Sequence, residues 1–161
     1  MNNINIIDIE ASGLGFDSYP VEISVLVEGT IKTWLIKPQP EWIHWDDKAE
    51  QIHGISRDQL NKQGLSALQV LNELNDFIKE SNGIIYSDAA YWDADWVDTL
   101  FYAFKEKREF HIESIYELFD EKQSGEFNKI KMNLAESGKY RQHRAEEDVK
   151  MILEAYQLIH K

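Results

Sequence analysis

The amino-acid sequence predicts an α/β fold in which a mixed five-stranded sheet is flanked by helices. The first observation is a succession of three strand-like segments, Ile4–Ile9, Val21–Val27 and Ile31–Ile36. The second is Glu28-Gly29, which indicates a tight turn, so these first three strands are expected to be antiparallel. The third is the alternation of strand-like and helix-like segments in the rest of the chain.

The later elements are expected from apolar spacing. Ile84–Tyr86 indicates a short buried strand, and Phe110–Ile115 is the candidate for the fifth strand. With no linker or repeat between these elements, residues 1–161 are expected to form a single domain. Four helices are expected, over Leu65–Ile78, Asp93–Phe104, Asn128–Glu136 and Glu146–His160.

Composition narrows the class of protein. Hydrophobic residues make up 43% and charged residues 29% of the chain, as is typical of a globular protein. The lack of cysteine excludes disulfides, thiolate zinc sites and cysteine nucleophiles, and it fits the cytoplasm, where we expect the protein to act. No apolar run approaches the roughly 20 residues of a membrane-spanning helix, and the start MNNINIIDIE lacks the regions of a secretory signal.

The first candidate site is the pair Asp8 and Glu10. Side chains two positions apart on a strand share a face, so Ile7 and Ile9 face one way and the two carboxylates the other. Adjacent carboxylates are costly to bury unless cations balance them, and Mg²⁺ takes such oxygen ligands. Taken alone, Asp-x-Glu favours a strand that ends at the surface in two solvated acids, because the pattern is common by chance.

The second and third candidate sites lie near expected helix starts. Asp93 occupies a position where Asp is also a preferred capping residue, and Asp88 and Asp95 are neighbouring acids of open role. His143 and Asp148 are five positions apart, which on an ideal helix separates their side chains by about 140°. Both can reach one site only if His143 lies in the preceding loop or first turn. A histidine there could act as a general base toward a metal-bound water.

In this order, the segments resemble the DEDDh exonucleases of the ribonuclease H-like superfamily, which include proofreading exonuclease domains, ribonuclease T and oligoribonuclease. The resemblance runs from Ile4 to about Tyr156. DIEASGLG, WDADWV and HRAEED are similar to the family's three motifs, and IHGIS is similar to a further shared segment. The chain departs from the family at Ala11, where Thr is usual, and at Ser87-Asp88, where His-Asn is frequent.

The resemblance implies a ribonuclease H-like fold and a 3′→5′ exonuclease that releases nucleoside 5′-monophosphates from single-stranded DNA or RNA. It implies two Mg²⁺ or Mn²⁺ ions around the last phosphodiester, with His143 as the general base. The implied metal ligands are Asp8, which bridges both ions, Glu10, Asp93 and Asp148.

The same resemblance assigns a site for the 3′ end of the strand. Leu14 would wedge against the terminal base, and backbone at Gly13 and at Ala11 or Ser12 would hold the 3′ hydroxyl. His53 would line the same pocket.

The net charge of −12 argues against tight binding along a long duplex. Bound cations would cancel several carboxylates locally, and basic residues are bunched within Lys105–Arg108 and Lys129–Arg144. Short oligonucleotides or single-stranded 3′ ends are therefore the expected partners. No membrane partner is expected, and a homodimer or a polymerase partner stays open.

Two other functions share these residues. A ribonuclease H-type endonuclease would use the same sheet and carboxylates, although His-x-x-x-x-Asp near the C-terminus favours the exonuclease. A catalytically silent module that binds nucleic acid or a polymerase would fit the acidic composition and the altered second motif, but the intact acids and His143 argue against it. The sequence does not choose between DNA and RNA.

Overall fold

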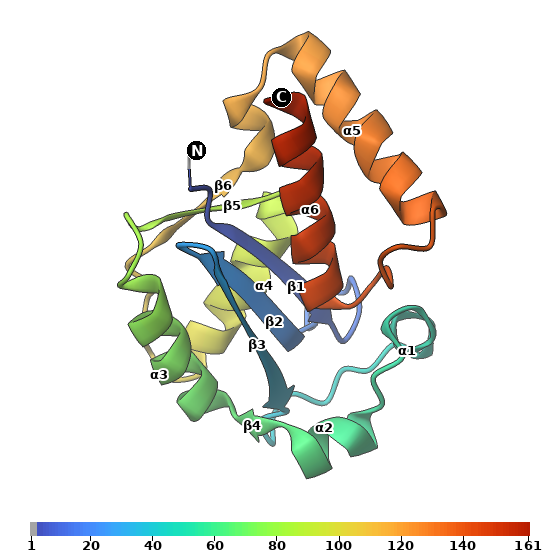
Figure 1. Ribbon diagram of the computed structural model, residues 1–161. Helices are drawn as coiled ribbons and strands as arrows, with labels where there is room; N and C mark the ends of the chain where they lie inside the picture. The colour runs from blue at the N-terminus through green and yellow to red at the C-terminus, as the bar shows by residue number, and fades with distance from the viewer. Residues whose placement is uncertain (1–2) are drawn as a thin grey trace.

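The computed structural model describes residues 3–161, in which a six-stranded mixed sheet has the order β4-β3-β2-β1-β5-β6 (Figure 1). β1, β2 and β3 form an antiparallel meander, whereas β1–β5, β5–β6 and β3–β4 pair in parallel. The strands are β1 Ile6–Ala11, β2 Pro20–Val27, β3 Thr30–Lys37, β4 Leu65–Ser66, β5 Ile84–Ser87 and β6 His111–Ser114.

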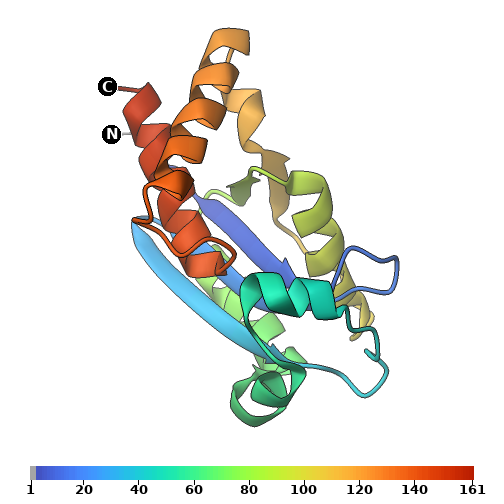
Figure 2. The same cartoon turned by 90° about the vertical axis from the view of Figure 1, so that its right-hand side faces the viewer.

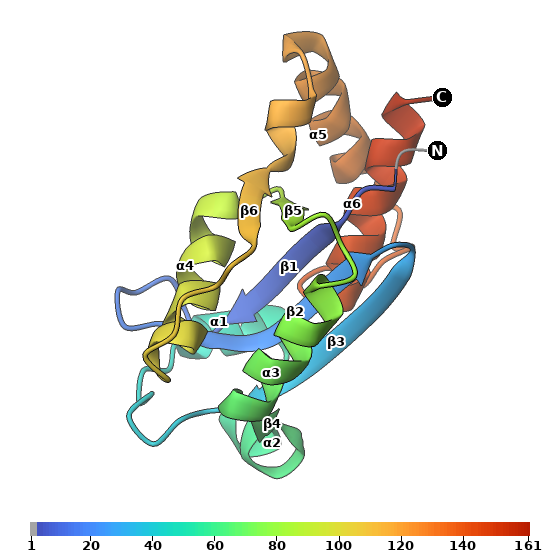
Figure 3. The same ribbon diagram turned by 90° about the vertical axis from the view of Figure 1, so that its left-hand side faces the viewer.

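Helices cover both faces of the sheet. α3 and α4 lie on one face, and α5 and α6 lie on the other (Figures 2 and 3). In residues 3–161 no helix is both long and apolar enough to cross a bilayer. The helices are α1 Asp47–His53, α2 Arg57–Gln63, α3 Ala67–Ile78, α4 Ala90–Tyr102, α5 Glu121–Glu136 and α6 Ala145–Ile159, with a 3₁₀ turn at Ile115–Leu118.

The α/β fold class and the antiparallel order of the first three strands are confirmed. The expected count of five strands was one too few, because Leu65–Ser66 begins as a short parallel edge strand beside β3 and not as a helix. Gly64 permits this approach, since a Cβ there would lie 2.5 Å from the Lys37 backbone nitrogen. Local periodicity carries no sign of a pairing between segments so far apart.

The helix predictions differ from the structure mainly at the starts. α4 begins at Ala90 rather than Asp93, and α5 begins at Glu121 rather than Asn128. The start of α5 is a capping box in which Asp120 and Gln123 each accept a hydrogen bond from the other's backbone. α1 and α2 were not predicted, because each is only seven residues long and has one buried side chain.

β1 lies between two separate apolar cores. Ile7 and Ile9 pack on the face of α3 and α4, while Ile4 and Ile6 pack on the face of α5 and α6. Burying each such side chain stabilises the fold by about 1.5–3 kcal/mol. The alternation fixes which side chains of β1 face α6.

Candidate active site

β1 directs two carboxylates toward α6. Asp8 and Glu10 continue the side of the strand on which Ile6 packs against α6, so this side changes from apolar to acidic near the end of the strand. The pairing with β2 shifts register between Glu10 and Ala11, and this irregularity ends the regular ladder beside the acids.

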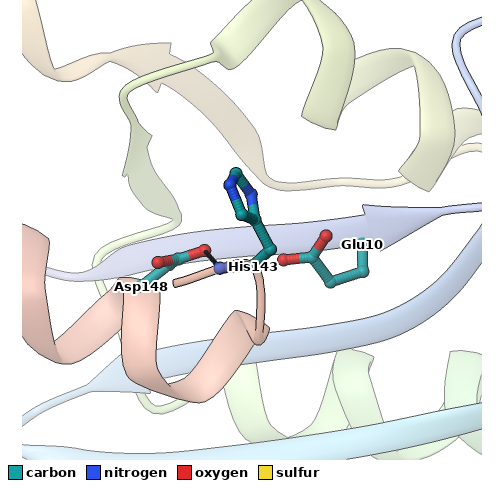
Figure 4. Close-up of side chains that lie close together, drawn as sticks. All are labelled: Glu10, His143 and Asp148. Atoms are coloured by element: carbon teal, nitrogen blue, oxygen red, sulfur yellow. Dashed lines mark hydrogen bonds between the residues drawn. The ribbon is translucent and has the colours of Figure 1, made fainter. Parts of the chain in front are cut away.

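The segment before α6 brings His143 and Asp148 to the same place. His143 adopts a left-handed conformation with φ 61°, and its backbone N–H donates to Asp148 Oδ2 at 3.0 Å. Asp148 lies in the first turn of α6, so the two residues have the loop-then-helix arrangement that their spacing requires. In Figure 4 the Glu10 and Asp148 carboxylates lie on either side of His143, whose imidazole points out from between them.

Three of these residues have the proximity of metal ligands. One ligand atom each from Glu10, His143 and Asp148 lie within 4.8 Å of one another. Asp8, His143 and Asp148 also line one cleft of about 470 Å³, whose walls come from β1, α5, α6 and the segment after β5. The cleft therefore gives the histidine and two of the four candidate carboxylates a common opening.

α4 supplies the fourth carboxylate. Asp93 is only 1% exposed, and its Oδ2 accepts a hydrogen bond of 2.6 Å from the Ser87 hydroxyl at the end of β5. Ser87 Oγ also accepts from the Ala89 backbone N–H at 2.9 Å, so Ser87 links the strand end to the Asp93 side chain. Asp93 lies inside the first turn of α4 and does not cap the helix. The N-cap residue is Ala89, and no side chain caps this end of the helix.

Burial makes the charged form of these acids unfavourable. It raises the pKa of Asp8 well above its usual value, and the charges of Asp93 and Asp148 raise it further. Burial also raises the pKa of Asp93, although the hydrogen bond from Ser87 opposes this shift. Asp8 Oδ2 is buried and has no hydrogen-bond partner among residues 3–161.

The pKa values of the remaining two acids, Glu10 and Asp148, are also raised. Burial and the neighbouring Asp148 raise the pKa of Glu10 to about 8. Burial raises the pKa of Asp148 to about 7 against the opposing His143 N–H. Carboxylates this poorly solvated, with an oxygen that lacks a partner, are the donor set that a hard divalent cation would satisfy. The residues therefore fit the group that the motifs imply.

Glu22 is a buried acid that the sequence analysis missed. Its carboxylate accepts from Arg144 Nη2 at 2.7 Å and Nε at 3.1 Å, and from the Ala145 backbone N–H at 2.9 Å. Glu22 stands opposite Glu10 in the β1–β2 pairing, so this pair ties the start of α6 to the sheet beside the acids. A glutamate inside the apolar run of β2 was the available signal.

Asp88, whose role the sequence left open, pairs with Lys131 of α5 in the wall of the cleft. The Asp88 carboxylate is close enough to raise the pKa of Asp8, Asp93 and Asp148, although burial is the larger cause for each. Nothing in the sequence connects residues 43 positions apart, and so the pair was not foreseen.

The loop after β1 holds most of the expected 3′-end residues. Ala11 and Ser12 are buried, and Ser12 Oγ accepts from the Tyr19 backbone N–H at 3.1 Å and lies 2.9 Å from His44 Nδ1. A Cβ on Gly13 would lie 2.6 Å from His44 Cε1, so a larger residue there would have to displace the His44 ring. Leu14 is 67% exposed. His44 therefore contacts both Ser12 and Gly13 in this loop, and no pattern in the sequence pointed to it.

His53 is buried at the end of α1. Its Nδ1 accepts the Ile55 backbone N–H at 3.0 Å, which places the ring proton on Nε2. That nitrogen is buried without a hydrogen-bond partner in the described chain. Burial lowers the pKa of His53, and the nearby Ala11 backbone carbonyl opposes the shift.

The chain resembles known proteins in its structure but not in its sequence. No family model matches the chain, and no curated protein matches its sequence. A structure of exonuclease I superposes with a TM-score of 0.75 at 13% identity, and covers 97% of this chain and 40% of that one. The chain has the fold of the part of exonuclease I that it matches.

Two further exonuclease I structures carry ligands. The E. coli enzyme in complex with a dT13 oligonucleotide has a TM-score of 0.72 at 12% identity, with 97% of this chain and 40% of that chain covered. A zinc-ion-bound form of the E. coli enzyme with single-stranded DNA has a TM-score of 0.71 at 14% identity and the same coverage. The chain spans about 40% of the length of these three exonuclease I chains.

Proposed function

We propose that residues 1–161 form one DEDDh-type exonuclease domain that removes nucleotides from the 3′ end of single-stranded DNA or RNA. The main support is the clustering of four poorly solvated carboxylates, Asp8, Glu10, Asp93 and Asp148, whose charges act on one another. His143 lies beside two of them, Glu10 and Asp148. The exonuclease I fold, solved elsewhere with a dT13 oligonucleotide, supports a single-stranded substrate.

In this proposal the four carboxylates hold two Mg²⁺ or Mn²⁺ ions. When bound, the ions would lower the pKa of a water and stabilise charge on the phosphate and on the leaving 3′ oxygen. His143 would accept the proton of the attacking water through its exposed imidazole, while the hydrogen bond from its backbone to Asp148 holds the turn in place. Water oxygen bonds to phosphorus, the bond to the 3′ oxygen breaks, and a nucleoside 5′-monophosphate leaves.

The 3′ terminus would bind at the loop after β1. Leu14 is exposed and free to contact the terminal base, and the rigid backbone at Ala11, Ser12 and Gly13 would hold the terminal hydroxyl. The Nε2–H of His53 is a buried donor that a substrate oxygen could satisfy.

The test is hydrolysis of 5′-labelled single-stranded DNA and RNA with Mg²⁺, with Mn²⁺ and with chelator. The proposal expects a metal-dependent ladder that shortens from the 3′ end and releases 5′-monophosphates, and the faster strand identifies the substrate. Asp8→Ala should abolish the ladder. Circular single strands should resist the enzyme.

Other outcomes point to the other functions. Cleavage of the circular strands would indicate the ribonuclease H-type endonuclease instead. Binding of the strand with no cleavage under any metal condition would indicate the catalytically silent module.

A further inference from the structure

One wall of the cleft is made by α5 and carries hydrogen-bond donors. Asn128 and Lys131 are one turn apart on this helix and both line the cleft, together with the acids Asp8 and Asp148 from the other walls. Neither the four-carboxylate arrangement nor His143 uses this wall. Its chemistry therefore needs a separate explanation.

Lys131 is the one Lys or Arg among the residues that line the cleft. Its side chain is 25% exposed and pairs with Asp88, whose side chain is 14% exposed. Burial lowers the pKa of Lys131, but the charge of Asp88 and its hydrogen bond raise the pKa more, so the ammonium keeps its proton. A fixed positive charge therefore stands within electrostatic reach of Asp8 and Asp148.

Asn128 is oriented by a neighbour. Its Oδ1 accepts a 2.6 Å hydrogen bond from the Tyr116 hydroxyl. Because the carbonyl oxygen is engaged, the amide presents its NH₂ group, which can only donate. Asn128 and Lys131 together offer the donors that phosphate oxygens accept.

A partly buried ion pair is weak evidence of a purely stabilising role, since desolvation offsets most of the attraction. A polyanion that enters a cleft lined by several acids needs at least one cation to receive it. The pair with Asp88 would hold the long Lys131 side chain toward the cleft. The ammonium has three N–H donors, so a phosphate oxygen could accept a second charge-assisted hydrogen bond from it while the pair with Asp88 stays in place.

We propose that Lys131 and Asn128 form a binding site for a phosphate of the substrate strand other than the one being cleaved, with Asp88 as the residue that positions the Lys131 ammonium. This inference rests on the proposed function, because it assumes a nucleic-acid strand in the cleft. It adds a strand-binding contact that the altered second motif, Ser87-Asp88, makes available.

The test measures binding and not turnover. Fluorescence anisotropy of a labelled oligothymidylate, with Ca²⁺ in place of Mg²⁺, would be recorded over a range of salt concentrations. The key variant is Asp88→Asn/Lys131→Met, which removes the ammonium but leaves no unpaired buried charge and keeps the net charge of the pair at zero. Lys129→Met, which changes an exposed lysine two positions before Lys131 on the same helix, is the control.

The double variant should bind about tenfold more weakly than the wild type. Its slope of log affinity against log salt should be smaller by about 0.7, the value for one phosphate contact on a single strand. Lys129→Met should keep the wild-type slope. A neutral methylphosphonate at one position should weaken wild-type binding and leave the double variant unaffected.

A double variant with wild-type affinity and slope would overturn the inference and leave the exonuclease proposal intact. The inference would also be overturned if the wild-type protein cleaved strands but bound every methylphosphonate strand as tightly as the unmodified strand. A wild type that neither binds nor cleaves any oligonucleotide would overturn the proposed function and this inference together.

Discussion

Glu10→Gln should make the metal-free protein more stable at pH 8 while it removes activity. Burial and neighbouring acids raise the pKa of Glu10 from 4.5 to about 8. A carboxyl whose pKa is higher in the folded state binds its proton more tightly there. Its contribution to stability is therefore complete below about pH 4.5 and is lost as the pH rises toward 8.

The size of the effect follows from that interval. A tenfold change in proton affinity corresponds to about 1.4 kcal/mol, so the 3.5 pH units between 4.5 and 8 set an upper bound of about 5 kcal/mol. Asp148, whose pKa is raised to about 7, titrates together with Glu10. The electrostatic cost of ionising the two groups is therefore shared between them. An effect of about 2 kcal/mol at pH 8 is therefore expected for Glu10→Gln.

Urea unfolding with chelator, at pH 5 and pH 8, measures this effect. The wild type should be less stable at pH 8 than at pH 5, Glu10→Gln should lose most of that difference, and Mg²⁺ should stabilise the wild type more than the variant at pH 8. Glu109→Gln, on an exposed acid between α4 and β6, controls for the general loss of negative charge. A Glu10→Gln protein that is less stable than the wild type at pH 8 in chelator would refute the reasoning.

Three further changes test other parts of the site. Asp8→Asn should lower kcat by at least about 1000-fold in a hydrolysis assay with an unchanged circular dichroism spectrum, and near wild-type turnover would contradict the assignment. Ser87→Ala removes the donor to Asp93, so the Mg²⁺ concentration for half-maximal activity should rise about tenfold in a metal titration; an unchanged value would exclude this orienting role. Arg144→Met leaves Glu22 buried without its cation and should reduce the free energy of unfolding by about 3 kcal/mol at pH 7, with partial recovery in Arg144→Lys, whereas equal loss in both variants would mean that the charge does not matter.

Local patterns in the sequence predicted the elements whose own residues determine them. β-Branched runs identified β1, β2 and β3, and the first two are rich in such residues because they are central strands buried on both faces. Apolar spacing identified the helical character of α3 and α6, because each of these helices buries one face. The order of the acidic motifs also predicted which carboxylates to examine. The spacing of His143 and Asp148 required a turn followed by a helix, and the structure has that arrangement.

Contacts between distant segments were decided only by the tertiary structure. The pairing of β4 with β3, the pair of Glu22 with Arg144 and the pair of Asp88 with Lys131 each join residues far apart in the chain. The raised pKa values of the four acids belong to this level as well. A carboxylate shows its type and spacing in the sequence, but the solvent that it loses and the charges that it faces depend on which segments the fold packs around it.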